Sequence, residues 1–142
     1  MPTLSLECEL AADLIRRYGL STGDLVVEVG SGEGKFLKSL QPFGVRVLGI
    51  ETSIRAMARA WSDGVDTIAA QFGLPTAEYV RTRYGAAKLL IARSVQPGSE
   101  DFAALIAAGA RCLTPDGAIA ILGTGVNAMV EVRPDSVLRR AA

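Results

Sequence analysis

One segment, Leu25–Gly34, constrains the fold of this 142-residue chain more than any other. It reads Leu-Val-Val-Glu-Val-Gly-Ser-Gly-Glu-Gly, and a second apolar run, Val47–Glu51, follows some twenty residues later and ends in a carboxylate. The first run is apolar on both faces, as is typical of a central parallel strand covered by helices. The two segments therefore predict a strand, a glycine turn, a helix and a second strand, which together form a ligand pocket at one edge of an α/β sheet.

Three glycine-rich signatures compete for this loop, and spacing separates them. A phosphate-binding P-loop needs glycine six residues before its lysine and Ser or Thr after it, but Val29 and Phe36 occupy these places around Lys35. A dinucleotide fingerprint needs Gly or Ala at position 35 or 37, where Lys35 and Leu37 stand. The spacing excludes the P-loop, weakens the nicotinamide alternative and leaves an acidic-x-G-x-G-x-G pattern over Glu28–Gly34.

That pattern resembles motif I of the class I S-adenosylmethionine-dependent methyltransferases, and Glu51 falls on their acidic motif II position. The likeness extends from about Leu4 to Leu122. Within it, the string from Tyr18 to Ser31 looks like the methyltransferase domain of the sugar C-methyltransferases, whose zinc module and C-terminal domain are expected to be absent here. The resemblance implies S-adenosylmethionine as the cofactor, with the glycine loop against its methionine part and Glu51 on its ribose.

The candidate cofactor-binding residues surround this pattern and the ends of the next strands. Glu28 is expected near the cofactor's amino group, Gln71 near the adenine edges, and Ser94 at the mouth after the fourth strand. The full set is Glu28, Gly30, Ser31, Gly32, Gly34, Glu51, Thr52, Gln71 and Ser94. No catalytic residue is assigned, because the chain has no histidine and because Glu100 and Asp101 are better explained as helix-capping charges.

The remaining pattern predicts one α/β domain over 1–142, with a helix at 4–18, a core at 25–122 and an irregular tail at 123–142. Five strands form a doubly wound, Rossmann-like, mostly parallel sheet in the order 3-2-1-4-5. A short antiparallel sixth strand at 129–132 is an option, and the sheet is truncated relative to the seven-strand methyltransferase fold. Leu113–Gly117 is predicted as a turn. Ile54, Met57, Ala58 and Trp61 recur at helical spacing and predict a core-facing stripe.

Composition narrows the function classes. Basic and acidic residues number 15 each, with no run of like charge, so neither nucleic acid nor a membrane is indicated as a partner. A small-molecule acceptor fits better. Cys8 and Cys112 match no metal spacing and predict reduced thiols, hence no metal site and a cytoplasmic location. No apolar run approaches the ~18 residues of a membrane span.

Three functions remain open. The first is an S-adenosylmethionine-dependent methyltransferase, or the cofactor-binding domain of one. The second is a catalytically degenerate module that works with a partner subunit, or as a homodimer, through an exposed sheet edge at strand five. The third is a nicotinamide-dinucleotide-binding domain.

Overall fold

The computed structural model describes residues 6–93, 98–123 and 129–133. In chain order the elements are α1 (Leu6–Tyr18), β1 (Leu25–Val29), α2 (Lys35–Leu40), the short 3-10 helix η1 (Gln41–Phe43), β2 (Arg46–Glu51), α3 (Ile54–Ser62), β3 (Thr67–Ala69), α4 (Leu74–Tyr84), β4 (Ala87–Arg93), α5 (Glu100–Cys112), β5 (Leu113–Leu122) and β6 (Met129–Val132). Strands alternate with helices as far as β5, which is the alternation that the sequence predicts. No helix in these ranges is long and apolar enough to cross a membrane.

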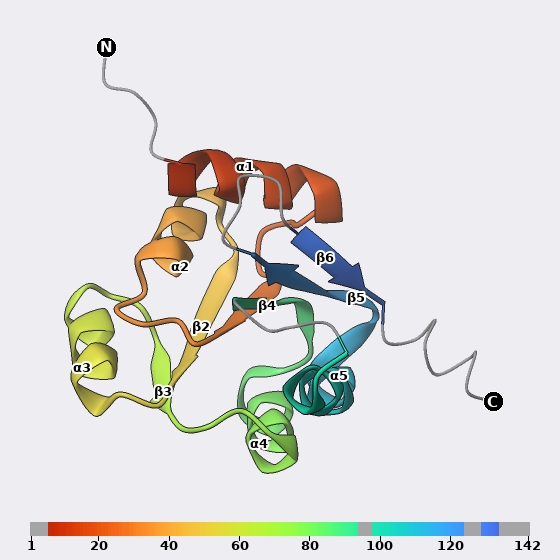
Figure 1. Ribbon diagram of the computed structural model, residues 1–142. Helices are drawn as coiled ribbons and strands as arrows, with labels where there is room; N and C mark the ends of the chain where they lie inside the picture. Colours follow the sequence, from red (N-terminus) through yellow and green to blue (C-terminus); the bar gives the residue numbers. More distant parts are fainter. Residues whose placement is uncertain (1–5, 94–97, 124–128, 134–142) are drawn as a thin grey trace.

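The strands form one sheet in the order β3-β2-β1-β4-β5-β6. All neighbours pair in parallel except β5 and β6, which are antiparallel. The predicted order 3-2-1-4-5 and the short sixth strand are thus confirmed. Helices α1, α2 and α3 cover one face of the sheet, and α4 and α5 cover the other (Figure 1). The ends of β1 and β4 meet at the centre of the sheet, where ligands bind in doubly wound folds.

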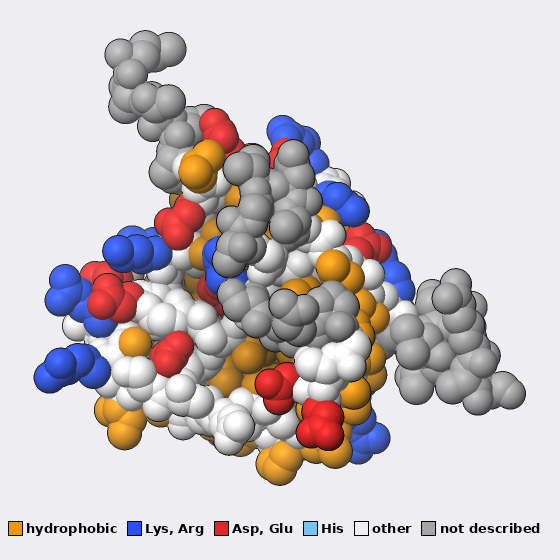
Figure 2. Space-filling view, viewed as in Figure 1, with side chains coloured by type: hydrophobic (Ala, Val, Ile, Leu, Met, Phe, Trp, Pro, Cys, Tyr) orange, Lys and Arg blue, Asp and Glu red, His pale blue; other side chains and the backbone are white. Residues whose placement is uncertain are grey.

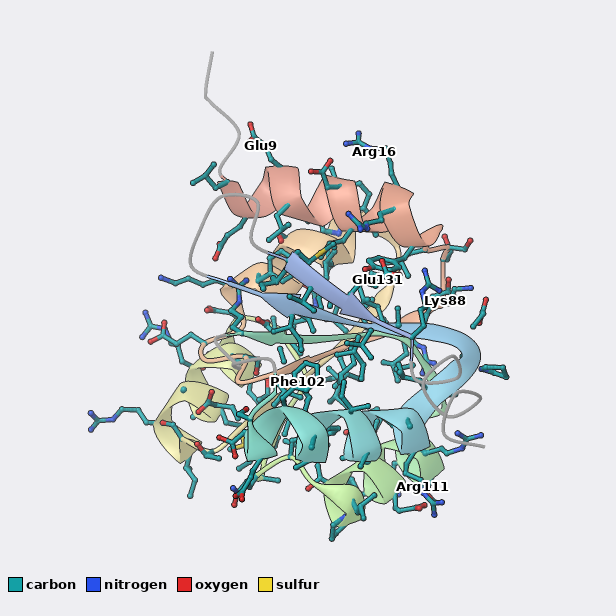
Figure 3. All side chains as sticks on the ribbon, turned by 45° about the vertical axis from the view of Figure 1, so that its right-hand side comes forward. Glu9, Arg16, Lys88, Phe102, Arg111 and Glu131 are labelled. Carbon is teal, nitrogen blue, oxygen red and sulfur yellow. The ribbon has the colours of Figure 1, made fainter. Side chains whose placement is uncertain are left out.

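Two apolar layers hold the helices against the sheet. On β1, Val26 packs into the layer under α1 and α2, while Leu25 and Val27 pack into the layer under α4 and α5. Figure 3 shows the same division, with Phe102 directed from α5 toward the sheet and Glu9 on the outer side of α1. Because β1 is buried on both sides, its carboxyl end is a rigid support for the loop that follows.

Two expectations about strand five are wrong. The predicted turn at Leu113–Gly117 lies inside β5, although the pairing with β4 shifts there, from Ala87 with Leu113 to Leu89 with Ala118. The expected exposed edge is also covered, because residues 119–122 pair with β6. The β6 strand is further tied to α1, since the Tyr18 hydroxyl donates a 3.0 Å hydrogen bond to Glu131 on β6. The outer strands of the described sheet are β3 and β6.

The predicted core-facing stripe of α3 is also wrong. Ile54 is 70% exposed and Trp61 is 60% exposed, and the helix instead buries Ala60 completely. The Trp61 indole N–H donates a 2.8 Å hydrogen bond to the carbonyl of Thr67 on the edge strand β3. Helical spacing identifies an apolar stripe but not the neighbour that the stripe contacts. In α3 the small Ala60 faces the sheet, and the large Trp61 lies against the edge strand β3.

Candidate functional site

The glycine loop leaves β1 in a conformation that other residues rarely adopt. Gly30, Gly32 and Gly34 have φ values of 75°, 59° and 82°. The N–H groups of Gly30 and Ser31 both donate to the carbonyl of Ile50 on β2, at 2.8 and 3.4 Å. The loop is therefore fastened across the carboxyl ends of two neighbouring strands, with backbone that can approach a ligand closely.

Glu51 links the end of β2 to this loop. One carboxylate oxygen, Oε1, accepts a 2.9 Å hydrogen bond from the N–H of Gly32, and Oε2 accepts one of 2.8 Å from the N–H of Ser53. Gly32 and Glu51 are nineteen positions apart, and the carboxylate joins them into one unit. A carboxylate oxygen has lone pairs for more than one donor, so these bonds leave acceptor capacity for a ligand hydroxyl.

A hollow of about 410 Å³, here called the β2 hollow, opens beside Glu51. Predicted site residues Thr52 and Gln71 line it together with Gly30, and Ile50, Phe72 and Leu105 give it apolar walls. In the space-filling view, hydrophobic side chains form the floor of a recess with acidic side chains at its rim (Figure 2). The combination of an apolar floor and a few polar groups is typical of small-molecule sites.

Glu28 lies in a different environment, inside the sheet. Its side chain is 2% exposed, and Oε2 accepts a 3.0 Å hydrogen bond from Nε of Arg93 on β4. The other oxygen, Oε1, accepts no hydrogen bond from the described residues, and neither does the buried Oγ of Ser31. Burial raises the pKa of Glu28 to about 7, against the lowering effect of Arg93. A buried acceptor without a donor is costly, so a ligand that supplies one gains binding energy there.

A second hollow of about 410 Å³, the β1 hollow, opens in front of Glu28. Its lining residues are Glu7, Glu28, Gly30, Ser31, Glu33, Lys35, Phe36 and Arg93. Gly30 and Arg93 line both hollows and mark the wall between them. The guanidinium of Arg93 lies over the ring of Phe36, 5.1 Å from its centroid, which adds a cation–π contact to its bond with Glu28.

The structure brings most of the predicted residues together at this edge of the sheet. Glu28, Gly30 and Ser31 line the β1 hollow, Glu51, Thr52 and Gln71 line the β2 hollow, and the loop glycines lie between them. Ser94 lies outside the described residues. Among the described residues, no group of three or more metal-ligating side chains comes together.

Sequence reasoning missed Arg93, Phe72 and the position of Asp101, which lines the β2 hollow. A signal for Arg93 was present, because a charged residue at the end of the apolar run Leu89–Ala92 stands at the carboxyl edge of the sheet. In a doubly wound fold that edge carries the ligand.

Comparison with known proteins identifies a family. Residues 27–121 match the family described as "Methyltransferase domain". The C-methyltransferase NovU from Streptomyces niveus is 35% identical over 103 residues, which are 72% of this chain and 24% of NovU. This chain therefore spans about a quarter of the length of that relative.

Solved structures agree with the family match. A methyltransferase from Geobacter sulfurreducens, solved with S-adenosyl-L-homocysteine, is 26% identical with a TM-score of 0.57, and the match covers 84% of this chain and 47% of that one. The sugar N-methyltransferase KedS8 from a Streptoalloteichus species shares the fold at 18% identity with a TM-score of 0.63, covering 82% of this chain and 47% of that one. The family match favours the methyltransferase prediction over the nicotinamide alternative. The chain belongs to the S-adenosylmethionine-dependent methyltransferase domains.

Proposed function

We propose that this chain holds S-adenosylmethionine across the two hollows and serves as the cofactor-binding domain of a methyltransferase that acts on a small-molecule acceptor. The observation that carries the proposal is the pairing of two carboxylates on either side of one glycine loop. Glu51 fastens the loop from the β2 hollow, and Glu28 offers an oxygen with no donor among the described residues toward the β1 hollow. A ligand with hydroxyls at one end and a cation at the other satisfies both.

The adenosine part of the cofactor fits the β2 hollow. The ribose hydroxyls donate to the Glu51 carboxylate, which is already oriented by the N–H groups of Gly32 and Ser53. The adenine ring lies among apolar side chains such as Phe72 and Leu105, with Gln71 at its polar edge. A carboxylate acceptor makes bonds of about 1.5–3 kcal/mol each, so Glu51 contributes much of the affinity.

The methionine part fits the β1 hollow. The ammonium group donates to Oε1 of Glu28, which is buried and accepts no other bond from the described residues. The cofactor then crosses the wall formed by Gly30, where a side chain is absent and the backbone has a φ of 75°. This placement puts the sulfonium near the glycine loop, between the two carboxylates.

Methyl transfer needs alignment more than protein functional groups. When bound, S-adenosylmethionine would supply an electrophilic methyl group, and in-line attack by the acceptor would displace S-adenosylhomocysteine, with the electron pair of the broken bond on sulfur. Correct placement of donor and acceptor supplies a large part of the rate. A carbon acceptor also needs a base to form its nucleophile. We assign the acceptor-side groups to a further segment or a partner subunit, because this chain covers only 24% of NovU.

A second candidate is a module that binds the cofactor and works through a partner without transferring a methyl group itself. We propose that such a partner, or a second copy of the chain, pairs at β6, which is the outer strand of the described sheet on that side. We also propose a single domain and a cytoplasmic location. The location fits the buried Cys112, which forms no disulfide.

Calorimetry with S-adenosylmethionine, S-adenosylhomocysteine and NAD tests the proposal. We expect heat with the first two and none with NAD. Absence of binding to both sulfur cofactors contradicts the proposed function. If they bind, incubation with methyl-labelled donor and a panel of small nucleophiles, with and without cell extract, separates the candidates. Label transfer by the chain alone supports the enzyme, and binding without transfer in any mixture supports the module.

A further inference from the structure

We propose that Arg93 binds the carboxylate of the cofactor's amino-acid part and thereby makes the site selective for the complete zwitterion. The inference rests on the proposed function and adds a binding residue to it. It arises from Arg93 being the charged side chain that lines both hollows. The cofactor's methionine end carries one positive and one negative group, so a site that holds it needs an acceptor and a donor side by side.

Arg93 is held in place by two contacts. Nε donates to Glu28 at 3.0 Å, and the guanidinium lies over the Phe36 ring at 5.1 Å. An arginine side chain has five N–H donors, and neither terminal nitrogen donates a hydrogen bond to another described residue. The side chain is 39% exposed and lines both hollows. A fixed guanidinium with available donors recognises a carboxylate at low entropic cost.

The charges around the β1 hollow match a zwitterion better than a simple anion or cation. Three carboxylates, from Glu7, Glu28 and Glu33, and two cations, from Lys35 and Arg93, line it. Glu28 is the buried member, its Oε1 has no donor among the described residues, and Arg93 stands directly against its other oxygen. An ammonium on Oε1 and a carboxylate on the guanidinium complete an alternating arrangement of charges, which avoids like-charge contacts.

Lys35 is the alternative cation for the same carboxylate. It is the first residue of α2, it is exposed, and its ammonium makes no hydrogen bond or ion pair with another described residue. A flexible exposed ammonium loses more entropy on binding than the fixed guanidinium. A second alternative is that Arg93 only neutralises Glu28. In that case its removal weakens every ligand whose ammonium binds Glu28, whether or not that ligand has a carboxylate.

A matched pair of ligands separates these roles. S-adenosylmethionine and decarboxylated S-adenosylmethionine share the adenosine, the sulfonium and the amine, and they differ in the carboxylate alone. We expect the unmodified chain to prefer the complete cofactor by about tenfold or more in Kd, as a charge-assisted bond requires. Arg93→Gln abolishes this preference, Arg93→Lys keeps part of it, and Lys35→Gln keeps nearly all of it. Circular dichroism verifies that each variant is folded.

The results that overturn the inference are distinct from those that overturn the proposed function. Loss of the preference in Lys35→Gln, or an equal loss of affinity for both ligands in Arg93→Gln, overturns the role of Arg93 while cofactor binding stands. The same holds if the unmodified chain has no preference. If Arg93→Gln does not fold, Arg93→Lys is the deciding variant, and an unchanged preference in it overturns the role. Absence of binding of both ligands to the unmodified chain overturns the proposed function and this inference together.

Discussion

The β1 and β2 hollows each contain a glutamate carboxylate, but the two carboxylates differ in how fully the fold satisfies their hydrogen bonds. In the β2 hollow, both oxygens of Glu51 accept backbone N–H donors, from Gly32 and Ser53, so this carboxylate is fixed before any ligand arrives. In the β1 hollow, Glu28 is almost fully buried, one oxygen has no donor among the described residues, and burial raises its pKa to about 7. One carboxylate is satisfied by the fold, and the other is satisfied only in part.

This difference indicates a division of labour along one ligand. A pre-oriented acceptor loses little entropy when it binds hydroxyls, so the β2 hollow supplies affinity. A buried acceptor that lacks a donor stores an unfavourable desolvation energy that a bound cation relieves, so the β1 hollow supplies selectivity for charge. Substitutions on either side of the glycine loop test this contrast.

The largest effect is expected for Glu51→Ala. The substitution removes the acceptor for two ribose hydroxyls and also frees the N–H groups of Gly32 and Ser53, which loosens the loop. Affinity for S-adenosylhomocysteine should fall by about 100-fold or more by calorimetry, from two bonds of about 1.5–3 kcal/mol each. Glu9→Ala is the control, because Glu9 points to solvent from α1 (Figure 3). Equal affinities for the two variants contradict the assignment of the β2 hollow.

A second substitution tests how closely the glycine loop packs against β2. A Cβ on Gly49 of β2 lies 2.3 Å from Oγ and 2.9 Å from Cβ of Ser31 in the loop. Gly49→Ala should therefore lower the free energy of unfolding by about 1–3 kcal/mol, measured by urea titration. Adding Ser31→Gly removes both Ser31 atoms and should recover part of the loss in a double-mutant cycle, while Thr67 Oγ1 remains 3.1 Å from the new Cβ. Gly73→Ala is the control, because its Cβ has room and its backbone is extended.

A third test uses the unusual acidity of Glu28. An ammonium beside Oε1 favours the carboxylate, so binding lowers a pKa that burial holds at about 7 in the free chain. Affinity for S-adenosylhomocysteine should rise with pH up to about 7 and then level off, while Glu28→Gln should show no such rise and bind about tenfold more weakly at pH 8. Arg93 and Glu7 act on the same carboxylate and are present in both proteins.

The stability of the unliganded chain should also depend on the pKa of Glu28. Because the folded-state pKa of Glu28 lies above its usual 4.5, the folded state binds more protons, and the free energy of unfolding should fall as pH rises from about 4.5 to 7. Glu28→Gln should remove this fall. A stability curve that is the same in both proteins contradicts a neutral, buried Glu28.

The sequence predicts the sheet and the loop because both depend on local chemistry. Glycines that need positive φ and apolar strands such as Leu25–Val29 are visible as patterns, and right-handed crossovers leave few strand orders. The proximity of Glu51 to Gly32 follows in the same way, because adjacent parallel strands end at one edge.

Contacts that depend on packing partners could not be predicted. The bond between Arg93 and Glu28 joins residues 65 positions apart, and neither sequence segment indicates that it contacts the other. Trp61 satisfies helical spacing, but its indole bonds to the carbonyl of Thr67 on the edge strand. The α3 residue that packs in the core is Ala60. The covered edge of strand five depends on a pairing of Ile119 with Val132, which a weak four-residue strand pattern does not specify.

The smallest effect is expected for Gln71→Ala in the β2 hollow. Gln71 is exposed there, and its assigned partner is a neutral edge of adenine. A neutral hydrogen bond contributes about 0.5–1.5 kcal/mol, so Kd should rise only about two- to tenfold. Adenosine compared with inosine, which has a carbonyl in place of the amine, measures the contact directly, and Gln71→Ala should reduce discrimination between them. If discrimination survives, the Asp101 carboxylate on the same hollow is the next acceptor to test for the amine, and Asp101→Asn should then remove the discrimination. Loss of discrimination in either variant supports adenine binding in the β2 hollow. Discrimination that survives both substitutions contradicts adenine binding there.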